Sequence, residues 1–208
     1  MTDYVLVGGG GLARELIDWF TPSLSASGSG FVGYLDDTGE SMAAYGSRLP
    51  WLGTIKDHAP SGDRQLVMAV GPPRGKAAVA ETLRAAGAVF ATLIHPTAWV
   101  SASARVDAGA VIGLHAHISA DAHAGELVLV GAFSGIGHDA AVGPGSTLSS
   151  YVDLTGGVTS GHTCLFGSGA RVLPRLTIGE RCTIGAGAVV VRNVPDDTTV
   201  YAQPARSL

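Results

Sequence analysis

A branched aliphatic residue returns every six residues through the second half of the sequence, and this repeat constrains the fold more than any other feature. Only Ala124 and Ser160 break the pattern. A small residue, often alanine, follows each repeat position by four residues, and glycine often follows it directly. The series is Ile94, Val100, Val106, Ile112, Ile118, Ala124, Val130, Ile136, Val142, Leu148, Leu154, Ser160, Phe166, Val172, Ile178, Ile184 and Val190.

A period of six fits neither an α-helix nor a strand with alternating apolar residues. It is typical of a parallel β-helix, in which each hexad supplies one short strand and one corner. The aliphatic side chains should fill the interior, and stacked coils should bury one continuous core. Glycine suits corners that need unusual backbone dihedrals. We therefore predict about five all-β coils over residues 91–208, with a C-terminal tail; a β-sandwich with coincidental spacing is the alternative.

Composition excludes several classes of function. Only 14% of the 208 residues are charged and 46% are hydrophobic, which indicates a globular chain with a sizeable core. The net charge is −4 and there is no basic run, so nucleic acids and anionic membrane surfaces are not expected partners. We find no segment that resembles a membrane span or a cleavable leader, and therefore expect a cytoplasmic protein.

The two cysteines, Cys164 and Cys182, are three hexads apart and both occupy the small inward position. In a cytosolic protein, buried thiols at such positions are expected to stay reduced and to pack as small apolar groups. A disulfide between neighbouring coils is the alternative.

Residues 1–90 read as a separate α/β domain. An apolar strand at Tyr4–Val7 runs into the glycines Gly8–Gly11, and a helix is expected over Leu12–Phe20. Strand, glycine loop and helix commonly open a nucleotide-binding unit, because backbone N–H groups at the helix start can hold a phosphate. A tight turn that only packs the helix onto the strand is the alternative. The Ser- and Gly-rich segment Thr21–Gly30 should be a loop.

A second strand, Phe31–Leu35, ends at Asp36 and Asp37. Acidic residues at this place can bind ribose hydroxyls or a base edge, although Asp-Asp-Thr-Gly is also a good turn sequence. A third strand, Leu66–Val70, and a helix from Arg74 to about Ala86 follow. The domain therefore holds half of a Rossmann dinucleotide fold, which suits a single nucleotide such as a nucleotide-sugar better than NAD.

His138 and Asp139 form the pair with the clearest chemical potential. They stand at an expected corner, so the imidazole should point outward. A carboxylate beside a histidine orients the ring and stabilises its charged form, which makes a general base near neutral pH. An inert surface histidine is the alternative. The remaining histidines show no metal-ligand spacing, and no metal is expected.

The sequence resembles the left-handed β-helix sugar acyltransferases with an N-terminal nucleotide-sugar-binding domain. These include sialic acid O-acetyltransferases and the N-acetyltransferases of bacillosamine- and perosamine-type amino sugars. The resemblance implies a left-handed coil, a homotrimer, and acetyl-CoA bound as co-substrate between adjacent prisms. It rests on the Val7–Gly11 loop, Tyr34-Leu35-Asp36-Asp37, Ile94-His95-Pro96, Gly137-His138-Asp139, the segment Ile184–Val190 and Pro204-Ala205-Arg206.

The resemblance also implies roles for individual residues. His138 is the implied base, Asp139 supports it, and the Gly156 amide is the implied oxyanion donor. Ser168 and Ala186 match pantetheine-contact positions, and Thr147 stands where the family has a CoA-contacting histidine. Leu12 replaces a histidine of the first loop. The implied nucleotide-sugar site comprises Gly10, Gly11, Leu12, Asp36, Asp37 and Gly71.

We therefore predict an acetyl-CoA-dependent N-acetyltransferase that acts on the amino group of a nucleotide-linked amino sugar. One alternative is an O-acetyltransferase of the sialic acid type, which would use the same base on a hydroxyl. A second is a non-catalytic, trimeric nucleotide-sugar-binding scaffold, favoured by the histidine replacements at Leu12 and Thr147. An oxidoreductase that uses the glycine loop would lack its second nucleotide-binding half.

Overall fold

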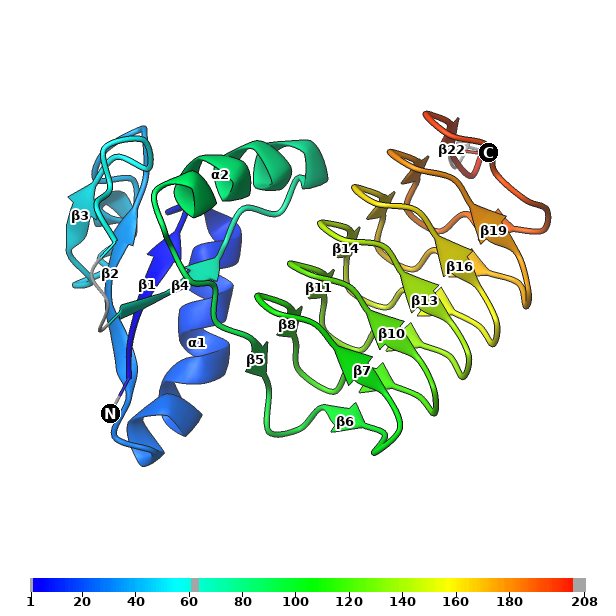
Figure 1. The fold of residues 1–208 in the computed structure, drawn as a ribbon, viewed down its shortest axis with the longest axis horizontal. Coiled ribbons are helices and arrows are strands. Elements are labelled where there is room, and N and C mark those ends of the chain that lie inside the picture. Colours follow the sequence, from blue (N-terminus) through cyan, green and yellow to red (C-terminus); the bar gives the residue numbers. More distant parts are fainter. Residues whose placement is uncertain (1, 61–63, 204–208) are drawn as a thin grey trace, which may run out of the picture.

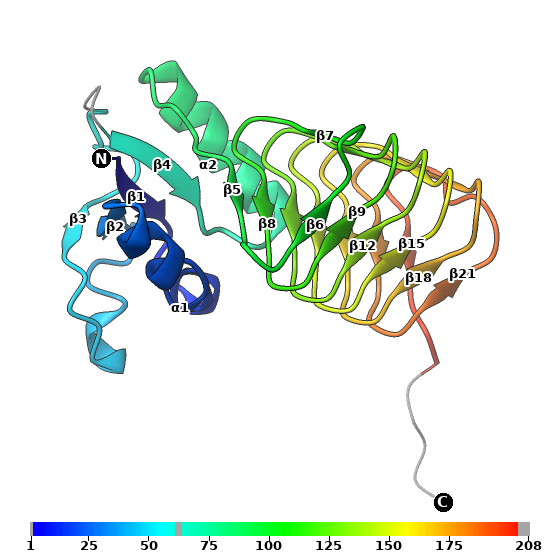
Figure 2. The same ribbon diagram turned by 90° about the horizontal axis from the view of Figure 1, so that it is seen from below.

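The computed structural model describes residues 2–60 and 64–203, which form a small α/β unit followed by a long β-solenoid (Figure 1). The motif Pro204-Ala205-Arg206 lies outside the described residues. The solenoid extends away from the α/β unit, and its coils stack one behind another (Figure 2).

The α/β unit is a four-stranded parallel sheet with a helix on each face. Alternate residues of the central strand β1 point to opposite faces: Leu6 packs with helix α1, and Val5 and Val7 pack with helix α2. The strand order is β3-β2-β1-β4. The elements are β1 (Asp3–Val7), α1 (Gly11–Ala26), β2 (Gly30–Leu35), the 3-10 helix η1 (Ala43–Tyr45), β3 (Trp51–Gly53), β4 (Arg64–Met68) and α2 (Pro73–Ala85).

Helix α1 is longer than the sequence predicts. It continues through the expected loop to Ala26, with Pro22 inside it. Leu16, Phe20 and Leu24 share one face at a spacing of four, and all three are buried in the same cluster. Tertiary packing of this stripe outweighs the local preference of a Pro- and Ser-containing segment. The short strand β3 was not predicted, because three residues are too few to show a period.

The solenoid consists of two-residue parallel strands arranged as three faces. Face 1 has the order β22-β20-β17-β14-β11-β8-β5, face 2 has β21-β18-β15-β12-β9-β6, and face 3 has β19-β16-β13-β10-β7. We call the turns that follow them the first, second and third corners. The strands are β5 (Leu93–Ile94), β6 (Trp99–Val100), β7 (Arg105–Val106), β8 (Val111–Ile112), β9 (His117–Ile118), β10 (His123–Ala124), β11 (Leu129–Val130), β12 (Gly135–Ile136), β13 (Ala141–Val142), β14 (Thr147–Leu148), β15 (Asp153–Leu154), β16 (Thr159–Ser160), β17 (Leu165–Phe166), β18 (Arg171–Val172), β19 (Thr177–Ile178), β20 (Thr183–Ile184), β21 (Val189–Val190) and β22 (Thr199–Val200).

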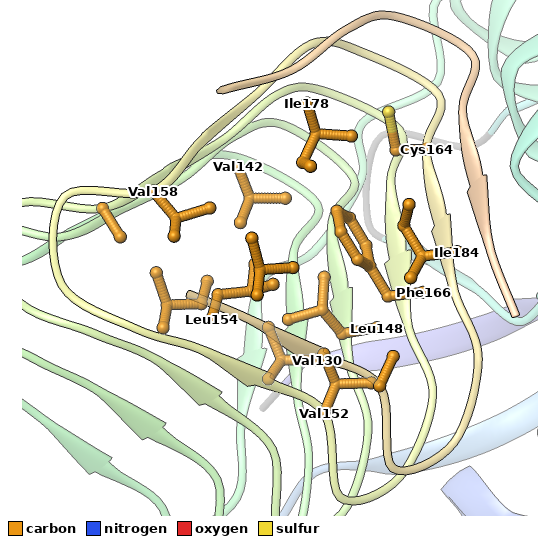
Figure 3. Packing of buried hydrophobic residues seen from close by; sticks show 14 of the residues in the cluster. Val130, Val142, Leu148, Val152, Leu154, Val158, Cys164, Phe166, Ile178 and Ile184 are labelled. Atoms are coloured by element: carbon orange, nitrogen blue, oxygen red, sulfur yellow. The ribbon is translucent and has the colours of Figure 1, made fainter. Parts of the chain in front are cut away.

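The interior of the solenoid confirms the repeat. Figure 3 shows Leu148, Leu154, Phe166 and Ile184 directed into one core, where each is 0% exposed. Residues 18 apart lie in register on successive coils, as in the pair Leu148 and Phe166. Both cysteines are free and buried in the same core. The chain is thus a parallel β-solenoid of the left-handed β-helix type, as predicted, preceded by a small α/β unit.

The glycines that follow the aliphatic residues have a different purpose from the one predicted. Their φ angles are not left-handed; instead, a side chain there would strike the next coil. A methyl group on Gly143, for example, would lie 2.7 Å from the backbone nitrogen of His162. The left-handed residue comes two positions after the glycine and is often not glycine, as at Phe133 (φ 58°) and Asp139 (φ 57°). The hexad glycine therefore permits close stacking of coils.

The α/β unit packs on the first coils of face 1. Leu93, Val111 and Leu129 of that face belong to the same buried cluster as Leu16 and Phe20 of α1. This shared core holds the two parts of the chain together.

Candidate active site

His138 and Asp139 lie side by side on the second corner, between β12 and β13. His138 Nδ1 is 2.7 Å from Asp139 Oδ2, and both side chains are well exposed, at 71% and 67%. A carboxylate only accepts hydrogen bonds, so Nδ1 must carry the proton. In the neutral ring, Nε2 is then the unprotonated nitrogen. The left-handed turn at Asp139 is fixed by its N–H, which donates to Ala120 O at 3.0 Å.

The ring of His138 lies across Gly156 of the next coil. A methyl group on Gly156 would lie 3.0 Å from imidazole Cδ2 and closer still to Nε2 and Cε1. The absence of a side chain therefore makes room for the ring. The Gly157 N–H donates to His138 O at 2.8 Å, while the Gly156 N–H has no acceptor among residues 2–60 and 64–203. An unprotonated nitrogen and an available amide donor thus share one corner.

Large apolar side chains are exposed at the two ends of face 2 and on its corners. Trp99 and Val189 project from the first and last coils of the face, at 59% and 53% exposure, and the outward row between them is His117, Gly135, Asp153 and Arg171. Leu173 is exposed on the second corner. On the first corner, Phe133 and Tyr151 stack with ring centroids 5.1 Å apart. Exposed apolar side chains favour an interaction surface, and here they flank a polar centre of face 2.

A pocket of about 290 Å³ lies between the α/β unit and face 1. The α/β unit contributes Leu12 and Gly71, and the solenoid contributes Thr147 and Ser168. The pocket therefore brings together four of the residues singled out in the sequence. Its remaining lining residues are Glu15, Trp19, Pro72, Leu129, Gly131, Leu148, Ser149, Ser150 and Leu165.

Other predicted residues are not brought together within one chain. Ser168 and Ala186 follow face-1 strands and so lie on the first corner, on successive coils. His138 and Gly156 follow face-2 strands and lie on the second corner. Face 2 separates the two sets, so a single chain does not place the base next to these two implied CoA contacts.

The glycine loop presents an open helix start. Gly10 caps α1 without any side-chain hydrogen bond, and a methyl group on Gly10 would meet nothing within 4 Å. Gly11 is likewise exposed. The first backbone N–H groups of α1 therefore face open space, as a phosphate site requires.

The two acidic residues are largely engaged within the protein. Asp36 accepts hydrogen bonds from Gly9 N–H (2.7 Å), from Thr38 N–H (2.8 Å) and Oγ1 (2.6 Å), and from Ser41 Oγ (3.1 Å). Burial raises the pKa of Asp36, but these hydrogen bonds together outweigh it and leave the pKa below its ordinary value. Asp37 Oδ1 accepts from Ile55 N–H at 2.8 Å. Asp36 therefore fixes both the glycine segment, through Gly9, and its own turn, through Thr38, whereas Asp37 holds the segment that follows β3.

Sequence reasoning missed two basic residues near these sites. The guanidinium of Arg14 lies 3.6 Å from the ring centre of Tyr45, and its buried Nε has no partner within the described part of the chain. Arg14 and Tyr45 also line a broad cavity of about 810 Å³ beside α1 and β2. Arg14 follows the glycine loop by three residues, which was a usable signal. Lys76, which is 1% exposed in α2, gave none, because a lone lysine in a helix normally reaches solvent.

The described part of the chain contains neither a metal-binding cluster nor a membrane-spanning helix. No group of three or more His, Cys, Asp or Glu side chains among the described residues could hold a metal ion. Within the same residues, neither helix has the length and apolarity of a membrane span.

Comparison with solved structures gave matches over nearly the whole chain, whereas no protein-family model and no curated protein matched. PerB from Caulobacter crescentus, in complex with CoA and GDP-perosamine, is 31% identical, with 99% of this chain and 97% of that chain covered and a TM-score of 0.85. The acetyltransferase domain of PglB from Neisseria gonorrhoeae, in complex with acetyl coenzyme A, is 29% identical, with coverage of 99% and 98% and a TM-score of 0.86. WeeI from Acinetobacter baumannii, at 18% identity and a TM-score of 0.85, shares the fold.

A parallel β-solenoid of six-residue repeats behind a small α/β unit is the architecture that this chain shares with PerB and the PglB acetyltransferase domain. The sequence identity of 31% to PerB, over nearly all of both chains, also shows the family within this class of folds. The chain belongs to the hexapeptide-repeat sugar acyltransferase family and is an acyltransferase.

Proposed function

We propose that this enzyme transfers an acetyl group from acetyl-CoA to the amine of a nucleotide-linked amino sugar. Perosamine N-acetyltransferase from Caulobacter crescentus, a structural relative, is 30% identical and was solved as a His-to-Asn mutant with CoA and GDP-perosamine. The observation that carries the proposal is the 2.7 Å contact between His138 Nδ1 and Asp139, which leaves Nε2 to act as the base.

In the proposed step, the sugar amine attacks the thioester carbon and forms the new C–N bond. His138 Nε2 takes the proton that the amine loses, and Asp139 stabilises the resulting imidazolium. The Gly156 N–H donates to the oxyanion of the tetrahedral intermediate. Collapse of that intermediate breaks the C–S bond, and the proton on His138 passes to the departing thiolate, which restores the base.

The α/β unit would bind the nucleotide. The open amides at Gly10 and Gly11 suit the phosphates, and the partial positive charge of the helix start adds to their attraction. Arg14 is the nearest cation, since its Nη2 lies 3.8 Å from where a Gly11 side chain would begin. Asp36 would act mainly by shaping this loop, and Asp37 by holding the segment that follows β3. The sugar would extend toward the pocket lined by Leu12 and Gly71.

We further propose that the active site forms between copies of the chain, in a homotrimer. The implied CoA contacts at Ser168 and Ala186 lie on a different corner from His138. The face between these corners has Trp99 and Val189 exposed at its ends, and Asp153 and Arg171 between them. A neighbouring copy packed on this face would complete a cleft for the pantetheine arm. Acetyl-CoA would then bind at the edge of the subunit interface, near the pocket that Thr147 lines.

The test replaces His138 by asparagine, which keeps a polar side chain of similar reach but removes the base. We expect turnover to fall by about two or more orders of magnitude, while acetyl-CoA binding measured by calorimetry stays intact. Near-normal turnover in this variant would refute the role of His138.

Substrate assays separate the proposed reaction from its alternatives. Labelled acetyl-CoA should label UDP-, GDP- or dTDP-linked 4-amino sugars but not free sialic acid. Labelling of sialic acid alone would instead establish an O-acetyltransferase. Failure to bind acetyl-CoA, together with nucleotide-sugar binding, would indicate a non-catalytic scaffold.

A further inference from the structure

Lys76 is a buried lysine that the proposed chemistry does not use. It projects from α2 and is only 1% exposed. Its ammonium donates three hydrogen bonds, to Leu127 O (3.0 Å), Ser146 O (3.0 Å) and Thr147 Oγ1 (2.8 Å). All three acceptors belong to the solenoid, so Lys76 reaches from the α/β unit into the third corner and face 1.

Thr147 in turn forms a hydrogen bond with the α/β unit. Its hydroxyl accepts from Lys76 and donates to Gly71 O at 2.7 Å. A hydroxyl has a single hydrogen, so the bond from the protonated lysine directs that hydrogen toward Gly71. The hydrogen bonds form a closed circuit that runs from Gly71 through Thr147 to Lys76 and back along the chain through Pro72.

The circuit lies at the edge of the pocket between the two parts of the chain. Gly71, Pro72 and Thr147 all line that pocket, and Leu12 lies beside Gly71, with Cδ2 3.8 Å from where a Gly71 side chain would begin. The rest of the junction is mainly apolar packing, which is non-directional and does not by itself fix the register of one part on the other. Hydrogen bonds are directional, so three bonds to defined partners can fix the position of the α/β unit on the solenoid.

We propose that Lys76, acting through Thr147, is a positioning residue that holds the Gly71–Pro72 loop at a fixed distance from the solenoid and so sets the geometry of the sugar pocket. This inference rests on the proposed function for the identity of the ligand. Lys76 does not touch the reacting atoms. Its removal should therefore affect the fit of the nucleotide-sugar and leave the acetyl-transfer step intact.

The experiment compares Lys76→Met and Thr147→Val with wild-type enzyme. Methionine keeps the length of the lysine stem without its donors, and valine keeps the shape of threonine without its hydroxyl. In assays below pH 7, where Lys76 is protonated, we expect KM for the nucleotide-sugar to rise about tenfold in Lys76→Met, as for one lost charged hydrogen bond, with kcat within about twofold. Because both changes break one circuit, the double variant should add little to either single variant.

Lys56→Met is the matched control, because Lys56 is the other lysine of the chain and is exposed on the same α/β unit. It should leave both kinetic constants unchanged. A fall in kcat with unchanged KM, or fully additive effects in the double variant, would overturn the positioning role. Should Lys76→Met fail to fold, Thr147→Val tests the same circuit.

Amide hydrogen exchange gives a readout that does not depend on turnover. Exchange should accelerate at residues 71–76 in Lys76→Met and Thr147→Val, and not in Lys56→Met. Unchanged exchange there overturns the inference even if the substrate assignment is right. Conversely, wild-type enzyme that acetylates no nucleotide amino sugar, while the variants still loosen this loop, overturns the proposed function and the sugar-pocket role but leaves the structural circuit established.

Discussion

Replacement of Gly156 by alanine would displace the ring of His138, the proposed base, with little damage to the fold. The new methyl group would lie 3.0 Å from His138 Cδ2 and closer to Nε2 and Cε1. Carbon atoms prefer separations of about 3.5–4.0 Å, so the ring must shift by about 1 Å. The backbone accepts alanine, because φ at Gly156 is not left-handed and Ala120 occupies the equivalent corner position two coils earlier.

The expected result is a loss of activity without a loss of stability. A misplacement of about 1 Å in a reacting group can cost about 100-fold in rate, so we expect kcat to fall by about that factor. The unfolding midpoint should stay level or rise slightly, because alanine restricts the unfolded chain by about 0.4–1 kcal/mol more than glycine does. Release of the CoA thiol, followed with a chromogenic thiol reagent, measures kcat, and calorimetry measures the midpoint.

Gly30→Ala provides the control, since it makes the same chemical change at a position where a methyl group would meet nothing within 4 Å. It should change neither the unfolding midpoint nor, by more than a few-fold, kcat. Wild-type turnover in folded Gly156→Ala would show that catalysis does not depend on the ring position seen across Gly156, and would refute the reasoning.

Three further predictions follow from the geometry. Asp139→Asn should lower kcat by about 10- to 100-fold, because a neutral amide does not stabilise the imidazolium. Asparagine tolerates the left-handed φ of 57° at this position, so circular dichroism should show an unchanged fold. An unaltered kcat would contradict the role of Asp139. Gly143→Ala should destabilise the solenoid by about 1–3 kcal/mol in urea unfolding, because its methyl group would strike the backbone of the next coil, whereas Gly30→Ala, with open space around it, should not. Burial lowers the pKa of Lys76 from 10.5 to about 7, so the form that donates to all three acceptors is the one present below that pH. Between pH 7 and 9 the folded chain carries a neutral amine there while the unfolded chain keeps its proton. The unfolding free energy of wild-type protein should therefore rise relative to Lys76→Met over this range, by up to about 1.4 kcal/mol per pH unit, and parallel pH profiles for the two proteins would contradict this.

The solenoid was predictable because its period is written into the sequence without interruption. Each coil repeats the same packing, so a buried residue such as Leu148 predicts the environment of Phe166 one coil later. The role of the corner glycines was misjudged, because close approach and left-handed φ both favour glycine and a sequence does not distinguish them. The three-dimensional structure shows that the left-handed φ occurs at residues such as Asp139, two positions after the glycine.

The site was partly predictable. The adjacency of His138 and Asp139 followed from the chain itself, and their exposure from their place at a corner. The engagement of Asp36 with the Gly9 N–H and the insertion of Lys76 beside Thr147 depend on contacts between segments that are 27 and 71 residues apart in the sequence. No local pattern encodes such contacts, since each needs the tertiary arrangement before either residue has a partner.

The stacking of equal coils also fixes distances along the solenoid axis. The α/β unit is anchored to the first coils through Leu93 and Val111, and His138 stands on a later coil, that of Ile136. Each coil advances the chain by about 4.8 Å. Insertion or deletion of one whole coil between these points would preserve the packing and move the proposed base by one step, so in the proposed function the number of coils would set the distance that a nucleotide-sugar has to span.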